Sequence, residues 1–311
     1  MSDVLEQAGG TRHDQPTART IAVSAIIPTW NRPDRLLATI DRIKACVPAP
    51  DEIIVHIDAG DHVSGPALAK AHPETRILRS DQRMGPGGGR NRLVAAARND
   101  IIASFDDDSF PVDADYFAAV VQLFRTHPEA HVVVASIFHD GESIVARSDN
   151  TIIVADFIGC GCAYRRQAFC ATGGYVPLAV AYGMEEADLT LQIHDGGGVV
   201  LHSHDLRIRH ATMLTHHAKP EVTAASISNL ALLAYARYPW SHFGIGLLQV
   251  ASRITWLIRN HRRQGVIRGI LAIPAQLWRH RAIRRPVKPA TLQIVRALRR
   301  GERASSHGAG P

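Results

Sequence analysis

The chain has 311 residues, a formal net charge of +6 and 46% hydrophobic residues, a composition typical of a soluble globular protein that buries a sizeable core. No stretch reaches the roughly twenty uninterrupted apolar residues that span a bilayer, because the most apolar segment, 243–258, contains Gln249 and Arg253. Residues 1–20 carry no apolar run, so we expect a disordered N-terminal tail, no signal peptide, and a cytoplasmic protein.

Apolar runs that end in polar or acidic loops predict buried strands at 21–27, 52–57, 75–79, 101–105, 131–135 and 151–157. Apolar residues at helical spacing predict helices at 33–44, 63–72, 93–98 and 113–127 between them. Two further short strands are expected at 199–201 and 206–210. This alternation predicts an α/β fold with a mostly parallel, doubly wound sheet.

The C-terminal third of the chain has a different pattern. Helices are expected from 221 onward, at 243–258 and at 266–278. Between 253 and 304 the charged residues are nearly all arginine, and Glu302 is the only acid. We therefore expect four parts, namely the tail, an α/β domain at 21–215, a helical basic region at 216–300, and a disordered tail at 301–311.

Three consecutive carboxylates, Asp106 to Asp108, directly follow the strand expected at 101–105. Adjacent carboxylates repel one another, and a fold normally keeps such a group where a cation or a proton neutralises it. In open α/β sheets, ligands bind at the carboxyl ends of strands, so this position favours metal-assisted chemistry. A solvated acidic turn is the alternative.

Cys160 and Cys162 are too close together for a zinc motif, and we expect them to be reduced thiols.

Two further segments carry chemical signals. The glycine-rich run at 85–89 precedes an expected helix, so its backbone N–H groups could approach an anion, although a plain turn is equally consistent with it. Glu185, Glu186 and Asp188 form a second acidic cluster at an expected helix start. Compensation of the helix dipole alone would also explain that cluster.

The order of these motifs resembles that of the family 2 glycosyltransferases, nucleotide-sugar-dependent enzymes with the Rossmann-like GT-A fold. The resemblance spans residues 21 to about 215 and rests on seven short segments in register: 26–32, 52–58, Gly85 with 89–91, 105–108, 165–175, 185–189 and His210. It implies an inverting transferase that moves a sugar from a nucleotide-diphosphate donor to an acceptor hydroxyl.

The resemblance also implies roles for individual residues. Asp58 would bond the donor base, with Pro28, Thr29, Trp30 and Asn31 lining it, and Gly89, Arg90 and Asn91 would lie against the donor. Asp107 and Asp108 match the D-x-D motif, with Asp107 towards the ribose or diphosphate and Asp108 on a divalent metal, Mg or Mn, that His210 can join. Asp106 would be structural. Glu186 matches the general base, and Glu185 and Asp188 are the next candidates.

The chain departs from the family's pattern at three places. The general-base position holds Glu186 where Asp is usual. Residues 58–61 read Asp-Ala-Gly-Asp where Asp-Asp/Asn-Gly-Ser is usual, and Gln192 replaces a common arginine. Two other functions remain open on the sequence alone: a nucleotidyltransferase, and a non-catalytic protein that binds nucleic acid or another polyanion.

The basic C-terminal region interleaves arginines with Trp256, Trp278 and aliphatic residues. That mixture is typical of a helix at a membrane interface, and it favours an anionic membrane over nucleic acid as the partner. We therefore expect peripheral attachment to the inner face of the plasma membrane. The acceptor expected from this location is a lipid-linked glycan or another glycan of cell-envelope polysaccharide biosynthesis.

Overall fold

The computed structural model describes residues 20–180, 182–212 and 219–308. The N-terminal tail expected at 1–20 lies outside this part of the chain except for its last residue, and the domain boundary expected at 215 also lies outside it.

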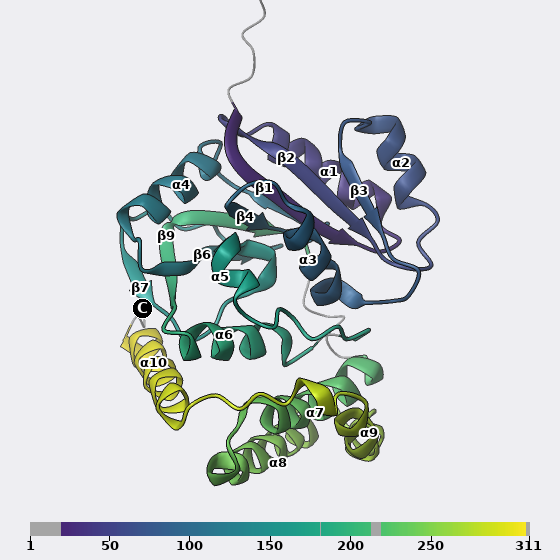
Figure 1. Ribbon diagram of the computed structural model, residues 1–311, viewed down its shortest axis with the longest axis vertical. Coiled ribbons are helices and arrows are strands. Elements are labelled where there is room, and N and C mark those ends of the chain that lie inside the picture. The colour runs from purple at the N-terminus through teal and green to yellow at the C-terminus, as the bar shows by residue number, and fades with distance from the viewer. Residues whose placement is uncertain (1–19, 181, 213–218, 309–311) are drawn as a thin grey trace, which may run out of the picture.

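A nine-stranded sheet forms the centre of the protein, and its main path has the order β3-β2-β1-β4-β8-β6-β9-β5 (Figure 1). The parallel pairs are β1–β2, β1–β4, β2–β3 and β6–β9. In contrast, β8 runs antiparallel between β4 and β6, and the short strands β5 and β7 pair antiparallel with β9. The predicted mostly parallel α/β sheet is therefore confirmed. The bounds are β1 (Thr20–Thr29), β2 (Ala49–Ile57), β3 (Arg76–Arg79), β4 (Ile101–Ser104), β5 (Ser109–Pro111), β6 (Ala130–His139), β7 (Thr151–Ile153), β8 (Cys162–Arg165) and β9 (Val199–His210).

Helices cover both faces of this sheet, as the apolar run of β1 predicted. Ala25 and Ile27 point into a core built with α1 (Pro33–Lys44), α2 (Ser64–Ala71) and α4 (Tyr116–Thr126). Ile26, between them in the sequence, points into the opposite core, built with α3 (Gly85–Ala96), α5 (Arg166–Cys170) and α6 (Glu185–Asp195). Because successive side chains of a strand alternate, an unbroken apolar run belongs to a strand buried on both faces.

The glycine-rich run is part of α3, which begins at Gly85 and not near 93 as expected. The glycines let this helix pack closely on its neighbours. A Cβ atom at Gly89 would lie 2.7 Å from Nδ1 of His56, and one at Gly87 would lie 2.5 Å from Oε1 of Glu185. The run therefore lets α3 approach the sheet and α6 at distances that a side chain would prevent.

The helical C-terminal region consists of α7 (Pro220–Arg237), α8 (Phe243–Arg259), α9 (Val266–Arg279) and α10 (Pro289–Gly308). In Figure 1, α7, α8 and α9 form a group beyond α6, and α10 lies at the opposite end of α6. Leu232 and Leu233 of α7 share a core with Leu191 of α6 and Val295 of α10. None of the helices within the described residues is long and apolar enough to cross a membrane.

Two predicted boundaries differ from the structure. The disordered tail predicted from 301 is wrong for 301–308, because α10 continues to Gly308 through Glu302, Arg303 and Ala304, all strong helix formers. The strands predicted at 199–201 and 206–210 are one strand, β9, whose pairing with β6 is irregular between Ala135 and Ser136. A bulge of this kind interrupts the alternating pattern without ending the strand.

A buried ion pair joins α6 to α7. Arg237 Nε lies 2.5 Å from Asp188 Oδ1 and Nη2 lies 3.0 Å from Oδ2, and both side chains are almost fully buried. We expect Arg237→Met to lower the free energy of unfolding by about 3–5 kcal/mol, because it leaves the carboxylate buried without its cation. Lys44→Met, which removes the exposed partner of Glu74, should cost less than about 1 kcal/mol. Urea denaturation of both variants measures the difference, and equal losses would contradict this assignment.

Candidate active site

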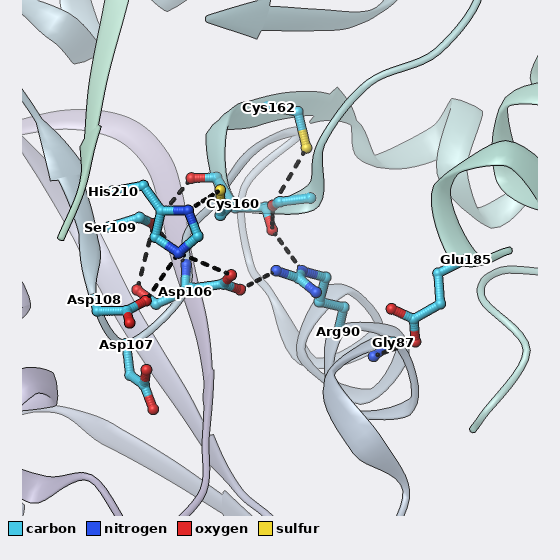
Figure 2. A network of polar contacts seen from close by, with 12 residues as sticks. Gly87, Arg90, Asp106, Asp107, Asp108, Ser109, Cys160, Cys162, Glu185 and His210 are labelled. Atoms are coloured by element: carbon cyan, nitrogen blue, oxygen red, sulfur yellow. Dashed lines mark hydrogen bonds and ion pairs between the residues drawn. The ribbon is translucent and has the colours of Figure 1, made fainter. Parts of the chain in front are cut away.

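Two arginines pair with the three carboxylates after β4. Asp107 accepts a hydrogen bond from Thr29 Oγ1 at 2.8 Å and pairs with the guanidinium of Arg32. Asp108 lies 2.7 Å from Arg32 Nη1. Asp106 pairs with the guanidinium of Arg90, which lies between Asp106 on one side and Gly87 and Glu185 on the other (Figure 2). Arg32 thus compensates the charges of Asp107 and Asp108, and Arg90 compensates that of Asp106.

These surroundings give the carboxyl groups different charge states. Burial raises the pKa of Asp107 to about 7, although Arg32 and Thr29 oppose the shift. Burial acts in the same direction on Asp108, but His210 and Arg32 together bring the pKa of Asp108 below its ordinary value. Asp108 therefore carries a firmer negative charge at neutral pH than Asp107 does.

His210 lies at the end of β9, where its ring faces two of the three carboxylates. Its Nε2 is 3.2 Å from Asp108 Oδ1 and 3.9 Å from Asp106 Oδ2. Its other nitrogen, Nδ1, is 3.7 Å from the sulfur of Cys160. Burial opposes the charged form of the imidazole, but Asp108 and Asp106 outweigh it and raise the pKa of His210.

This group has the chemistry of a cation site. Among the described residues, Asp106, Cys160 and His210 each offer a ligand atom within 4.8 Å of the others. Carboxylate oxygens suit hard divalent cations and imidazole is a common additional ligand, whereas burial raises the pKa of the Cys160 thiol and keeps it protonated. The predicted pair of Asp108 and His210 is adjacent, and Asp106, expected to be structural, joins the same group.

A cleft of about 480 Å³ opens beside these carboxylates. Six of the predicted donor-site residues line it: Pro28, Thr29, Trp30, Asn31, Asp58 and Asp107. The remaining lining residues are Arg32, His56, Arg83, Gly85, Pro86, Asp106 and Ala179. The cleft therefore runs from the loop after β1 to the acidic end of β4.

Trp30 and Arg83 form one wall of the cleft. The guanidinium carbon of Arg83 lies 3.8 Å from the centre of the Trp30 ring, and the indole N–H of Trp30 donates to the carbonyl of Ala59 at 3.2 Å. His56 lies at the floor, fully buried, with neither ring nitrogen hydrogen-bonded within the described residues. Burial lowers the pKa of His56, so the ring is neutral at neutral pH. A flat aromatic wall beside a neutral imidazole suits a planar ring.

Asp58 holds the loop that leads into α3. Its Oδ1 accepts from Ser80 Oγ and from Met84 N, each at 2.9 Å, and its Oδ2 accepts from Gly85 N at 2.9 Å. Burial opposes its charge, yet these hydrogen bonds bring the pKa of Asp58 below its ordinary value. The carboxylate therefore has a strong structural role in addition to its place in the cleft.

Gly89, Arg90 and Asn91, predicted to lie against the donor, do not line the cleft. Arg90 is 2% exposed, and its Nε donates to Ser104 Oγ at 3.0 Å. The side chain of Asn91 makes two hydrogen bonds with the backbone of Tyr175, at 2.8 and 2.9 Å. These residues pack behind the cleft wall because α3 turns its side chains towards the sheet and α6.

The second acidic cluster divides into two parts. Glu186 accepts from the backbone N–H of Gly159 at 3.3 Å, next to Cys160, and Glu185 accepts from Gly87 at 3.2 Å. Burial raises the pKa of Glu186, and it raises the pKa of Glu185 to about 8 with help from the neighbouring Glu186. Asp188, predicted as a candidate base, instead faces α7, whose Arg237 donates to both of its oxygens, and Gln192 of α6 donates to Oδ2 as well.

Sequence reasoning gave no role to Arg32 and placed Arg90 against the donor. Arg32 directly follows Asn31, whose positive φ of 56° turns the chain, so it faces the carboxylates across the sheet edge. Its position next to a predicted loop was only a weak indication that Arg32 belongs to the site. Nothing in the spacing indicated that Arg90 is buried between the two acidic clusters.

The α/β fold is of the GT-A type, the fold of glycosyltransferases of known structure. Residues 24–171, just under half of the chain, match the family model Glycosyl transferase family 2. Glycosyltransferase AglD from Haloferax volcanii is 29% identical over 118 residues, which cover 35% of this chain and 19% of that relative. The chain thus matches about a fifth of the length of this curated relative.

Two solved structures share the fold. A mannosyltransferase from Pyrobaculum calidifontis, PcManGT, in complex with GDP-Man and Mn²⁺, has a TM-score of 0.56 at 14% identity and covers 83% of this chain and 88% of its own. TarS 1-349 from S. aureus, in complex with UDP-GlcNAc, has a TM-score of 0.54 at 14% identity and covers 75% of this chain and 72% of its own. At these identities the likeness concerns the fold.

We expect Asp58→Asn to lower the free energy of unfolding by about 1.5–3 kcal/mol at pH 7, because an amide nitrogen cannot accept from the N–H groups that bind the carboxylate. The folded pKa of Asp58 is depressed, so its stabilisation is complete above the unfolded pKa of about 3.9 and is lost as the pH falls through the lowered value. The difference from the wild type should therefore shrink in acid. Urea denaturation across pH measures it, with the exposed Asp81→Asn as control. A difference that does not change with pH would contradict the charged role.

Proposed function

We propose that this protein transfers a sugar from a nucleotide-diphosphate sugar to an acceptor hydroxyl, with inversion at the anomeric carbon. The observation that carries this proposal is the cleft itself, which has an aromatic wall at Trp30 at one end and the carboxylates Asp106 and Asp107 at the other. A nucleoside diphosphate has the same polarity, with a planar base at one end and an anion that needs a cation at the other. The family match and the nucleotide-sugar complexes of the two similar folds support it.

In this proposal the base lies by Trp30 and Asp58, and the ribose and diphosphate approach Asp107. Asp108 and His210, with Asp106 beside them, would hold a divalent cation, Mg²⁺ or Mn²⁺, which supplies charge for the departing diphosphate. Arg32 contacts both Asp107 and Asp108, and its side chain is 46% exposed. An exposed cation of this kind can leave the carboxylates when a divalent ion takes over the neutralisation.

Glu186 is the proposed general base. It must be deprotonated to take a proton from the acceptor hydroxyl, and its raised pKa makes that carboxylate a stronger base than an exposed glutamate. A single base on the side opposite the leaving diphosphate produces inversion. Glu185 is the remaining alternative, because Asp188 is held by Arg237.

We expect Glu186→Gln to bind the donor as the wild type does and to lose at least about a hundredfold in kcat, since general-base catalysis contributes about 10²–10⁴. Wild-type kcat should rise with pH through the raised pKa of Glu186, because only the deprotonated form accepts the proton. Nucleotide release during transfer measures the rate, and a thermal shift with donor measures binding. Glu185→Gln is the control, and normal turnover by Glu186→Gln would move the base to Glu185.

Metal dependence gives a second test. A panel of UDP-, GDP- and dTDP-sugars should raise the melting temperature with Mn²⁺ present, because a ligand that binds only the folded state stabilises it. We expect Asp108→Asn to lose the Mn²⁺-dependent part of this shift, while Asp115→Asn, outside the cleft, retains it. A full Mn²⁺-dependent shift in Asp108→Asn would remove Asp108 from the metal site.

The acceptor we propose is a lipid-linked or cell-envelope glycan, reached from the cytoplasmic face of the plasma membrane. Exposed apolar residues on the C-terminal helices support it, among them Leu248 of α8 and Leu271 of α9, each more than 70% exposed. The same helices carry arginines, among them Arg253 and Arg259 of α8 and Arg268 and Arg279 of α9. The glycine-rich run at 85–89 argues against the nucleotidyltransferase alternative, because it is helical and not a phosphate-binding loop. The binding-protein alternative predicts RNA binding with a steep salt dependence and no nucleotide-sugar binding.

A further inference from the structure

A second cleft of about 480 Å³ lies beside the first, between the segment 177–180 and the helices α7 and α9. Arg83 and Ala179 line both clefts, so the two are neighbours along one surface. Nothing in the proposed sugar transfer accounts for this second cleft. Its charge and its position next to α9 indicate what it binds.

The cleft is cationic. Arg83, Arg268 and Arg279 line it, and all three side chains belong to exposed residues. Within the described part of the chain none of the three forms an ion pair, and Arg83 only stacks on Trp30. Glu221 is the one acidic residue of the lining. Arginine binds phosphate through two parallel N–H groups, so a cleft with three such side chains suits a phosphate group.

The walls of the cleft are held by close packing and hydrogen bonds. Gln276 of α9 donates to Asn229 of α7 at 3.0 Å, and Asn229 donates to the carbonyl of Val180 at 3.0 Å. Gly269 lets α9 approach α7, because a Cβ atom there would lie 2.7 Å from the carbonyl oxygen of Ala224. The helix that carries Arg268 and Arg279 is therefore fixed relative to the segment opposite.

The outer side of α9 carries an apolar stripe. Ile267, Leu271 and Trp278 are 74%, 73% and 70% exposed, and their spacing of four and seven residues places them on one side of the helix. Arg268 and Arg279 follow directly after Ile267 and Trp278, so the stripe borders the arginine-lined cleft. Arg281 stacks on Trp278, with its guanidinium carbon 4.4 Å from the ring centre. Apolar residues with arginine beside them and tryptophan at one end match the interface of an anionic membrane.

We propose that this second cleft binds the phosphate head group of a lipid whose chain lies along the apolar stripe of α9. The inference deepens the proposed membrane attachment and rests on it, because it names the lipid group that the C-terminal region recognises. The phosphate can belong to a bulk anionic phospholipid or to a prenyl phosphate that carries an acceptor. A nucleic acid would use the arginines but would gain nothing from Ile267 and Leu271.

Vesicle flotation with the full chain tests the proposal. The vesicles are phosphatidylcholine alone, phosphatidylcholine with phosphatidic acid, and phosphatidylcholine with a polyprenyl phosphate. The test variant is R268Q/R279Q, and the matched control is R259Q/R263Q, which removes the same charge from the same region outside the cleft lining. We expect binding to phosphate-bearing vesicles to fall about tenfold further in the test variant than in the control. Both variants lose about 1 kcal/mol of general electrostatic attraction per arginine, and the test variant also loses the direct contacts of the cleft with the phosphate.

Equal losses of vesicle binding in R268Q/R279Q and R259Q/R263Q would show a general electrostatic attraction. That result would overturn the proposal that the cleft binds the phosphate. A stronger effect with polyprenyl phosphate than with phosphatidic acid would identify the acceptor carrier as the source, and equal effects would identify bulk lipid. L271Q/W278Q should lose vesicle binding while keeping thermal stabilisation by inorganic phosphate, and retained vesicle binding would contradict the stripe. RNA binding that R268Q/R279Q selectively removes, without lipid binding, would also overturn the proposal.

The same variants separate this inference from the proposed sugar transfer. R268Q/R279Q leaves every residue of the first cleft unchanged, so its melting temperature should rise with nucleotide-sugar and Mn²⁺ as that of the wild type does. Loss of lipid binding with a normal donor shift supports the lipid site by itself. No donor shift in the wild type, with lipid binding retained, would refute sugar transfer and leave the lipid site standing.

Discussion

Negative charge at one edge of the sheet is the constraint on which the site depends. Asp107 and Asp108 are 1% and 4% exposed, so water cannot screen their repulsion. The cations that balance these two carboxylates and the neighbouring Asp106 come from three distant parts of the chain: Arg32 after β1, Arg90 of α3 and His210 at the end of β9. The order of the sheet brings these parts together, because β1 and β4 are neighbours and β5, which follows the carboxylates, pairs with β9 at His210.

Arg90 links the two acidic clusters because both need a cation to compensate their buried negative charge. Its guanidinium pairs with Asp106, and its positive charge also opposes the rise in pKa at Glu185 and Glu186. Burying an arginine is costly unless carboxylates surround it, and burying these glutamates is costly without a cation. The glycines of α3 permit the arrangement, since Gly87 and Gly89 bring the helix close enough for Arg90 to reach both clusters. A helix of ordinary side chains would keep Arg90 further from both.

Local pattern predicted the parallel strands and their acidic ends, because a strand buried on both faces must be apolar throughout and a carboxylate at its end interrupts the run. It could not predict β8, whose four residues contain Tyr164 and Arg165 and which becomes a strand only by pairing with β4 and β6. Glycine spacing suggested a loop at 85–89, since helix propensity disfavours glycine, but tertiary packing outweighed propensity there. Asp188 shows the same limit in a site residue. Its spacing fitted a catalytic cluster, and only the position of Arg237 on α7 shows that it faces the other way.

The buried ion pair between Asp188 and Arg237 also connects the candidate active site to the C-terminal helices. Asp188 lies one half-turn after Glu186 on α6, so the helix that presents the proposed base is fixed to α7 by two charged hydrogen bonds. In turn α7 packs on α9 through Gly269, and α9 carries the exposed stripe and the arginines of the second cleft. A surface that binds α9 is thus held at a fixed distance from Glu186, because α9 packs on α7 and α7 is joined to α6. If the acceptor lies in a membrane, as proposed, that relation sets the distance between the lipid surface and the proposed base, Glu186.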